Sequence, residues 1–184
     1  MPGIVIHIAC AKEYIRKHKN EIKNIDRFIK GTIEPDIASK KEGSSKRITH
    51  YENQGNDDID LFKFVHDPKV NINDDFFKGY FFHLIVDDWF YNIFFADENN
   101  RREKNNDTFY NDYDYLNNWL ISQYQIDVIE DIKESFKKGK KKSIYLDINK
   151  MKYFIEIVSN ISLKKAIENI ENDYVRGGDY EFRS

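Results

Sequence analysis

The chain has 184 residues, of which 40% are hydrophobic and 15% are aromatic, so we expect one folded domain with a substantial core rather than a disordered chain. The formal net charge is -3, and this near balance gives no overall attraction to nucleic acid or to an anionic membrane surface. A single cysteine, Cys10, excludes a disulfide within the chain.

Apolar residues at helical spacing predict helices throughout the first half of the chain. The first two are expected over residues 5–17 and 21–30, with Gly31 ending the second helix. Because Pro35 disfavours helix at the residue before it, we expect Asp36 on an ordered loop. A long loop is predicted over residues 38–58, and a short helix is predicted over residues 58–66. Asn73 is a good N-cap for the helix that follows, FFKGYFFHLIVDDWFYNIFF, whose apolar residues on every side predict a central helix.

The second half is predicted to be helical after a polar loop over residues 97–108. Three helices are expected in it: residues 112–136 with a break near Gln125, residues 147–159 starting at Asp147, and residues 162–174 starting at Ser162. The lysines of KKGKKK, residues 137–142, read as a basic linker. The predicted fold class is therefore all-α, a single-domain helical bundle over residues 1–184, with a candidate metal-site half (1–95) and a helical remainder (96–184).

All five histidines lie within the first 83 residues, which directs attention to that half. His83 and Asp87 are four residues apart, so they share one face of the predicted central helix and are close enough to bind one ion. An imidazole nitrogen and a carboxylate oxygen suit zinc, and also manganese or iron. Both residues lie in an apolar stretch, where an unpaired polar group costs roughly 2–7 kcal/mol. A metal would satisfy both groups, and so would a structural hydrogen bond between them.

Three further residues are candidate ligands, although their spacing in the sequence does not show whether they bind metal or have another role. His7 lies in the apolar stretch IVIHIACA, where a core histidine is the ordinary alternative. Asp36 is either a helix cap or a ligand, and His50, beside Thr49, is either exposed or a ligand.

Four segments occur in an order that resembles the bacterial zinc-dependent phospholipase C family, which is related to single-strand nucleases of the same all-helical fold. The segments are MPGIVIHIACA, FIKGTIEPDI, ITHY and FFKGYFFHLIVDDWFY, and they match in order over about residues 1–95. The resemblance implies an all-α enzyme that hydrolyses phosphodiesters at a cluster of metal ions. It further implies that Asp36, His50, His83 and Asp87 hold one zinc, and that Asp87 bridges to a second ion with His7 as another ligand.

The resemblance also implies a mechanism, in which water activated by the metal attacks phosphorus. Asp36 would be a ligand and the catalytic residue that positions this water. The chain departs from the secreted members of the family after Asp87, because they continue with further histidine ligands and this chain has none beyond His83. A third zinc site is therefore absent or is rebuilt from residues such as Asp112 or Asp114.

The predicted function is a metal-dependent phosphoesterase with one or two zinc ions, acting on a phosphoester small molecule or a phospholipid. One alternative is a metal-binding helical protein without catalytic activity, which the loss of the later histidines favours. Another is a different metallophosphohydrolase built on the adjacent pair His66–Asp67, although Pro68 is expected to end the helix at that pair.

We expect no nucleic-acid partner and no stable membrane insertion. The aromatic residues that could stack bases lie among acidic residues, whose charge would repel phosphates; they are Tyr110, Tyr113, Tyr115 and Trp119. No apolar run reaches the roughly 18 residues of a membrane span, and the N-terminal apolar run is too short for a signal peptide. A cytoplasmic protein is therefore expected, and its oligomeric state is left open.

Overall fold

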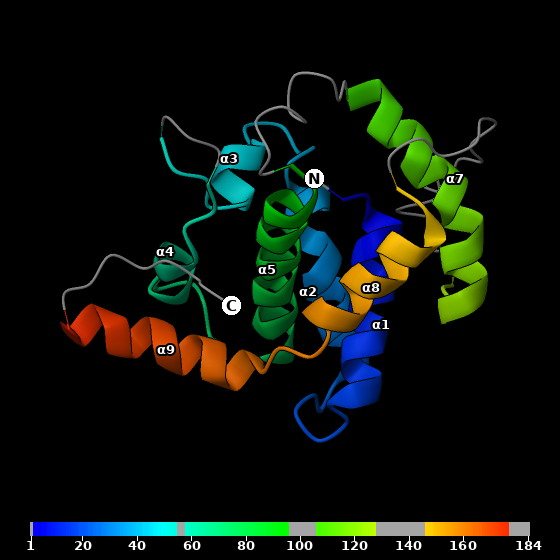
Figure 1. Ribbon diagram of the computed structural model, residues 1–184. Helices are drawn as coiled ribbons and strands as arrows, with labels where there is room; N and C mark the ends of the chain where they lie inside the picture. The colour runs from blue at the N-terminus through cyan, green and yellow to red at the C-terminus, as the bar shows by residue number, and fades with distance from the viewer. Residues whose placement is uncertain (1, 55–57, 96–105, 128–145, 177–184) are drawn as a thin grey trace.

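Figure 1 presents the computed structural model of the chain, which describes residues 2–54, 58–95, 106–127 and 146–176. These residues form helices and connecting loops and contain no strand; one isolated antiparallel bridge joins Glu52 and Ile59. The all-α prediction is confirmed at this level. None of the described helices combines the length and the apolar character needed to cross a bilayer.

The central helix is α5, which contacts α1, α2, α4 and α8 (Figure 1). Helix α7 packs on α1, and α9 packs on α4. Every residue from Phe81 to Asp87 is buried, as expected for a helix that is apolar nearly all round. In chain order the helices are α1 (Ile4–Lys17), α2 (Ile25–Ala38), α3 (Lys46–Thr49), α4 (Leu61–Val65), α5 (Asp75–Phe95), α7 (Asn106–Tyr124), α8 (Ile148–Val158) and α9 (Leu163–Arg176).

The prediction for the second helix was wrong at both ends. Helix α2 begins after Asn24, whose side chain accepts a hydrogen bond from the backbone N–H of Arg27, and it continues past Gly31 to Ala38. Gly31 does not cap the helix but is buried beneath the backbone of α5. Pro35 lies inside the helix, where it removes one backbone donor without ending the element. Asp36 therefore lies in the last turn of α2 and not on a loop.

Other helix boundaries differ by a few residues from the predicted ones. Helix α5 begins at Asp75 rather than near Asn73, and the Asp74 side chain accepts a hydrogen bond from the backbone N–H of Phe76. The short helix predicted over residues 58–66 is confirmed as α4, capped at its start by Asp60. The predicted loop over residues 38–58 contains the additional helix α3.

The starts of α8 and α9 agree with their predicted caps, whereas α7 begins at Asn106, six residues before the predicted start at 112 and inside the predicted loop 97–108. Asp147 accepts from the backbone N–H of Lys150 and opens α8, and Ser162 lies directly before α9. Helix α7 ends at Tyr124, and Gln125 has a φ of 48°, so the predicted break is confirmed. The predicted helix beyond residue 127, the basic linker 137–142 and most of the loop 97–108 lie outside the described residues.

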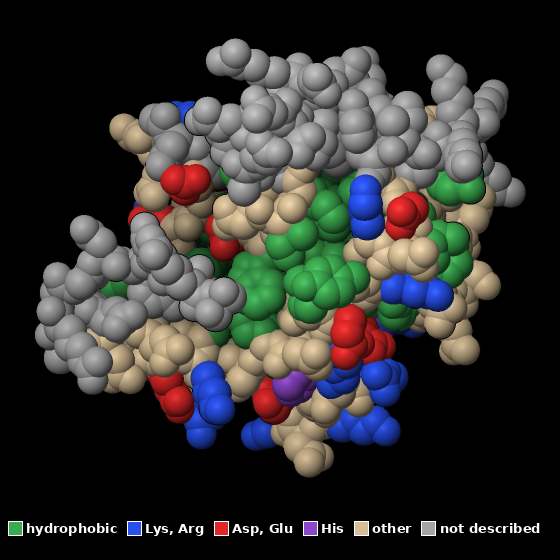
Figure 2. Space-filling model, viewed as in Figure 1, with side chains coloured by type: hydrophobic (Ala, Val, Ile, Leu, Met, Phe, Trp, Pro, Cys, Tyr) green, Lys and Arg blue, Asp and Glu red, His purple; other side chains and the backbone are tan. Residues whose placement is uncertain are grey.

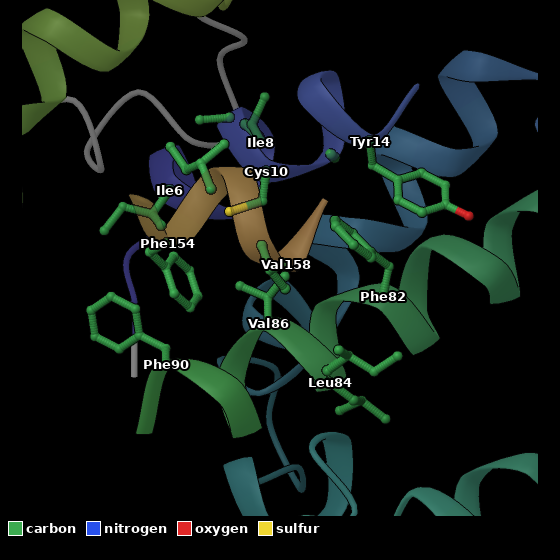
Figure 3. Close-up of a cluster of buried hydrophobic side chains, with 14 of the residues drawn as sticks. Ile6, Ile8, Cys10, Tyr14, Phe82, Leu84, Val86, Phe90, Phe154 and Val158 are labelled. Carbon is green, nitrogen blue, oxygen red and sulfur yellow. The ribbon is translucent and has the colours of Figure 1, made fainter. Parts of the chain in front are cut away.

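The core lies where α1, α5 and α8 meet, and Figure 3 shows apolar side chains from all three helices pointing toward one another. Ile6 and Cys10 come from α1, Val86 and Phe90 from α5, and Phe154 from α8. Burial raises the pKa of the Cys10 thiol, so this side chain is an apolar core residue at neutral pH and not a nucleophile.

Hydrophobic side chains, drawn in green, also reach the surface in the middle of the face drawn in Figure 2, over α5 and α8. Among the aromatics of α7, Tyr113 is buried in the core, Trp119 is partly buried against it and Tyr115 is exposed. The side chain of Tyr110 lies outside the described residues. Two of these four aromatics therefore serve the core rather than a base-stacking surface.

Candidate metal centre

The five predicted ligands lie together at the junction of α1, α2, α3 and α5. His7 comes from α1, Asp36 from the last turn of α2, and His50 directly follows α3, while His83 and Asp87 are one turn apart on α5. The side chains of His7, His50, His83 and Asp87 are at most 1% exposed, and that of Asp36 is 13% exposed. Segments far apart in the sequence thus deliver all the predicted ligands to one buried cluster.

The carboxylate of Asp87 lies at the centre of this cluster. Its Oδ1 is 3.3 Å from Nε2 of His7, and its Oδ2 is 3.3 Å from Nε2 of His83 and 3.4 Å from Nε2 of His50. The Nε2 atoms of His50 and His83 are 3.1 Å apart, and Oδ1 of Asp36 is 3.5 Å from Nε2 of His50. Each Asp87 oxygen therefore faces a different set of imidazole nitrogens.

These separations resemble the edges of a zinc coordination shell. Zinc binds imidazole nitrogen and carboxylate oxygen at about 2.0–2.2 Å, so two ligand atoms of a tetrahedral zinc lie about 3.3–3.6 Å apart. The distances that join Asp36, His50, His83 and Asp87 run from 3.1 to 3.5 Å. In two groups of three residues, one ligand atom of each residue lies within 4.8 Å of the others, close enough to share one ion: His7, Asp36 and His83, and His50, His83 and Asp87.

Buried polar atoms without a hydrogen bond are a second indication of a metal site in this cluster. Within the described part of the chain, both ring nitrogens of His7 and both carboxylate oxygens of Asp87 are buried without a hydrogen bond. Leaving such groups unpaired costs about 1–3 kcal/mol each, and more where the group is charged. A cation among them would satisfy three of the four atoms, namely Nε2 of His7 and both oxygens of Asp87.

The hydrogen-bond partners of the two Nδ1 atoms indicate that the Nε2 atoms of His83 and His50 face the cluster as acceptors. Nδ1 of His83 is 2.7 Å from the backbone carbonyl of Thr32, an acceptor only, so Nδ1 carries the proton. Nδ1 of His50 is 2.9 Å from Oγ1 of Thr49, whose own hydroxyl donates to the carbonyl of Ser45. In the neutral rings both Nε2 atoms are then lone-pair acceptors that face each other and a carboxylate, which is an arrangement suited to a cation.

Charge in the cluster keeps both carboxylates ionised at neutral pH. Burial raises the pKa of Asp87, but the nearby His83 and His7 outweigh it and hold this pKa well below its usual value. Burial likewise raises the pKa of Asp36, but the contact with His50 and the neighbouring imidazoles of His83 and His7 bring it down to about 2.

The pKa values of His7 and His83 are shifted in opposite directions. Burial lowers the pKa of His7, and the charge of His83 lowers it further, so His7 is neutral at pH 7. Burial also lowers the pKa of His83, but the charges of Asp87 and Asp36 outweigh it, so this pKa is raised. The rings of His7 and His83 are stacked with centroids 3.8 Å apart. Two ionised carboxylates therefore share the cluster with at least one neutral imidazole.

The position of His50 depends on a hydrogen bond from α5. His50 caps the C-terminal end of α3, and the phenol of Tyr80 donates to the carbonyl of Thr49, the residue before it. The ring of Tyr80 stacks on Phe64 with centroids 5.2 Å apart. Tyr80 thus fixes α3 to the same helix that carries His83 and Asp87.

A Tyr80→Phe variant is expected to bind zinc roughly 10-fold more weakly, at the low end of the range for residues that support ligands. The ring and its stacking remain, so the thermal stability should change little. Competition with a fluorescent zinc chelator measures the affinity. Tyr14→Phe is the matched control, because it removes another buried phenol, whose bond goes to Glu21 instead. Equal affinity in the Tyr80 variant and the wild type would contradict this role.

Other predicted or alternative residues lie outside the two ligand groups. His66 is exposed at the end of α4, with Nδ1 donating to the carbonyl of Phe62, and Asp67 accepts from the phenol of Tyr51. Asp112 is buried and accepts from the backbone N–H of Leu146. In the described part of the chain neither Asp112 nor Asp114 belongs to a group that can hold a metal, so a third site rebuilt from them gains no support.

Sequence reasoning missed the groups that orient the ligands, namely the carbonyl of Thr32 and the phenol of Tyr80. A carbonyl has no sequence pattern, and Tyr80 reads simply as one more aromatic in an apolar helix. Comparison of the chain with models of protein families, with curated proteins and with solved structures found no match in any of the three. The functional assignment therefore depends on the residues and on the geometry of this cluster.

Proposed function

We propose that the protein is a metal-dependent phosphoesterase of the zinc-dependent phospholipase C type, and that its fold is of that type. Its ligands for one or two zinc ions would be His7, Asp36, His50, His83 and Asp87. The observation that carries the proposal is the buried cluster of acceptor atoms, whose 3.1–3.5 Å separations are close to the distance of about 3.3–3.6 Å between ligand atoms of a tetrahedral zinc. The ordered resemblance of residues 1–95 to the family supports the same assignment.

The two oxygens of Asp87 suggest how the donors divide. Oδ2 lies beside His50 and His83, with Asp36 next to His50, which makes one set of donors. Oδ1 lies beside His7, which makes a second, smaller set. Nitrogen and carboxylate donors suit zinc, and also suit manganese and iron.

A bound ion would supply a nucleophile from water near neutral pH and would neutralise charge on the phosphoryl oxygens. The residues of the chain would hold the reactants around it. Asp36 is the most exposed member of the cluster, so the phosphoester would approach from its side. With a pKa of about 2, its carboxylate is a weak base and is better suited to orient water by a hydrogen bond than to store a proton.

A second candidate is a metal-binding protein without catalytic activity, and burial favours it. Structural zinc sites are closed by protein ligands, whereas catalytic sites keep one position open to substrate. Four of the five ligand side chains are at most 1% exposed. The site therefore has the enclosure of a structural centre on every side except that of Asp36.

Zinc-loaded protein is expected to hydrolyse at least one member of a panel that contains an activated phosphodiester, a phosphomonoester, a phospholipid and single-stranded nucleic acid. Activity should disappear with a chelator and return with zinc. Asp36→Asn, which keeps the size of the side chain but removes its charge, should lower the rate about 100-fold or more, the scale of one positioned catalytic group.

The panel also separates the two candidates. Fully metallated protein that is inert on every member would remove the phosphoesterase assignment and leave the non-catalytic metal-binding protein. Hydrolysis that survives the chelator would show that the activity does not depend on this cluster.

A further inference from the structure

Two glycines form the closest contact between α2 and α5. A Cβ atom placed on Gly31 would lie 1.8 Å from the backbone oxygen of Phe76, and one placed on Gly79 would lie 2.0 Å from the backbone oxygen of Phe28. Real side chains do not approach a backbone atom so closely, so neither position accepts any residue but glycine in this geometry. The contact is reciprocal, because each glycine faces a carbonyl of the other helix, as in helix pairs joined by weak Cα–H···O contacts.

This contact lies one turn before the metal ligands on both helices. His83 follows Gly79 by four residues, and Asp36 follows Gly31 by five. Thr32 is the residue after Gly31, and its carbonyl accepts the proton of His83 Nδ1 at 2.7 Å. That hydrogen bond crosses directly from α2 to α5, so it depends on the distance between the two helices.

We propose that Gly31 and Gly79 are positioning residues for the metal centre. Their contact sets the separation of α2 and α5 at which the Thr32 carbonyl orients His83 and the Asp36 carboxylate reaches His50. This inference rests on the metal binding assigned under the proposed function. A methyl group at either glycine would displace the facing carbonyl by roughly 1 Å or more. The bond to His83 Nδ1 would then exceed the hydrogen-bonding range of about 3.2 Å.

Gly31→Ala and Gly79→Ala in the full chain test this proposal, with Gly43→Ala as the matched control. Gly43 has a φ of 76° and no atom within 4 Å of a Cβ placed on it, so alanine there strains the backbone without touching the helix contact. Zinc affinity is measured by chelator competition, the ligand geometry by the visible spectrum of the cobalt(II) form, and helical content by circular dichroism. Nitrogen-15 NMR of the histidine rings in metal-free protein reports the tautomer of His83.

Both contact variants should keep their helical content and bind zinc about 10- to 100-fold more weakly. Their cobalt spectra should change, and His83 should lose the fixed Nδ1–H tautomer. Gly43→Ala should be less stable to heat while its affinity and cobalt spectrum match the wild type.

The outcomes separate this inference from the proposed function. Wild-type protein that binds no zinc would overturn both. If the wild-type protein binds zinc, and the folded alanine variants bind it with equal affinity and unchanged cobalt spectra, only the positioning role is overturned. If both alanine variants failed to fold, the glycines would be required for folding rather than for placing ligands, and the positioning role would also fall.

Discussion

His83→Ala is expected to lose zinc, with the affinity falling by more than the 10- to 100-fold typical of residues that only support ligands. His83 belongs to both of the groups whose ligand atoms lie close enough to share an ion, so its loss removes a donor from each. The variant also leaves the Thr32 carbonyl and the Asp87 carboxylate without this partner in the core.

The same variant should be markedly less stable, because removing one partner of a buried charged pair costs about 3–5 kcal/mol. For a chain of this size that cost corresponds to a decrease in Tm of roughly 10 °C. Elemental analysis measures the metal, and thermal unfolding followed by circular dichroism measures the stability.

His66→Ala is the control, since it removes an exposed histidine that lies outside both ligand groups. It should retain metal and lose little stability. Equal metal retention in the two variants would contradict the site. Loss of metal in the His66 variant, with retention in the His83 variant, would instead favour the alternative centre at His66–Asp67.

Zinc is expected to raise the Tm of the wild-type protein by about 8–16 °C when free zinc exceeds its Kd about 1,000-fold. Binding to the folded state alone contributes about 4 kcal/mol at that ratio. For chains of this size each 1 kcal/mol shifts Tm by about 2–4 °C. Differential scanning calorimetry with and without zinc measures the shift. Asp87→Asn should show almost no shift, because it removes the carboxylate that faces three of the histidines.

The stabilisation by zinc should shrink as the pH falls from 8 to 5.5. The metal needs a neutral imidazole, and the proton competes with it for Nε2 of His83. Because the pKa of His83 is raised in the metal-free fold, this competition begins above the ordinary imidazole value of about 6.5. A zinc-dependent Tm shift that stays constant over this pH range, or that survives in Asp87→Asn, would contradict binding at these ligands.

Local patterns predicted much of the helical structure. Apolar spacing identified α1 and α5, and capping side chains located the starts of α8 and α9. Helix α2 was mispredicted because Gly31 and Pro35 both read as signals that end a helix. The tertiary contact with α5 overrides that local signal, since the glycine is needed where two backbones meet and a proline costs the helix only one donor.

The candidate site was predictable only in part. The spacing of His83 and Asp87 places them together on one helix face, and this follows from helical geometry alone. Spacing does not bring His7, Asp36 and His50 to that face, and only the ordered resemblance to a known family joined them. The carbonyl of Thr32 and the phenol of Tyr80 act through contacts between helices, which no local pattern encodes.

We expect the buried histidine–aspartate cluster to bind metal. Elemental analysis of protein purified without a chelator or a nickel column tests this most directly. We expect one or two transition-metal ions per chain, chiefly zinc, because the cluster offers a full set of nitrogen and oxygen ligands. Less than about a tenth of an ion per chain, even after reconstitution with zinc, is far below the near-stoichiometric binding of such sites and would contradict it.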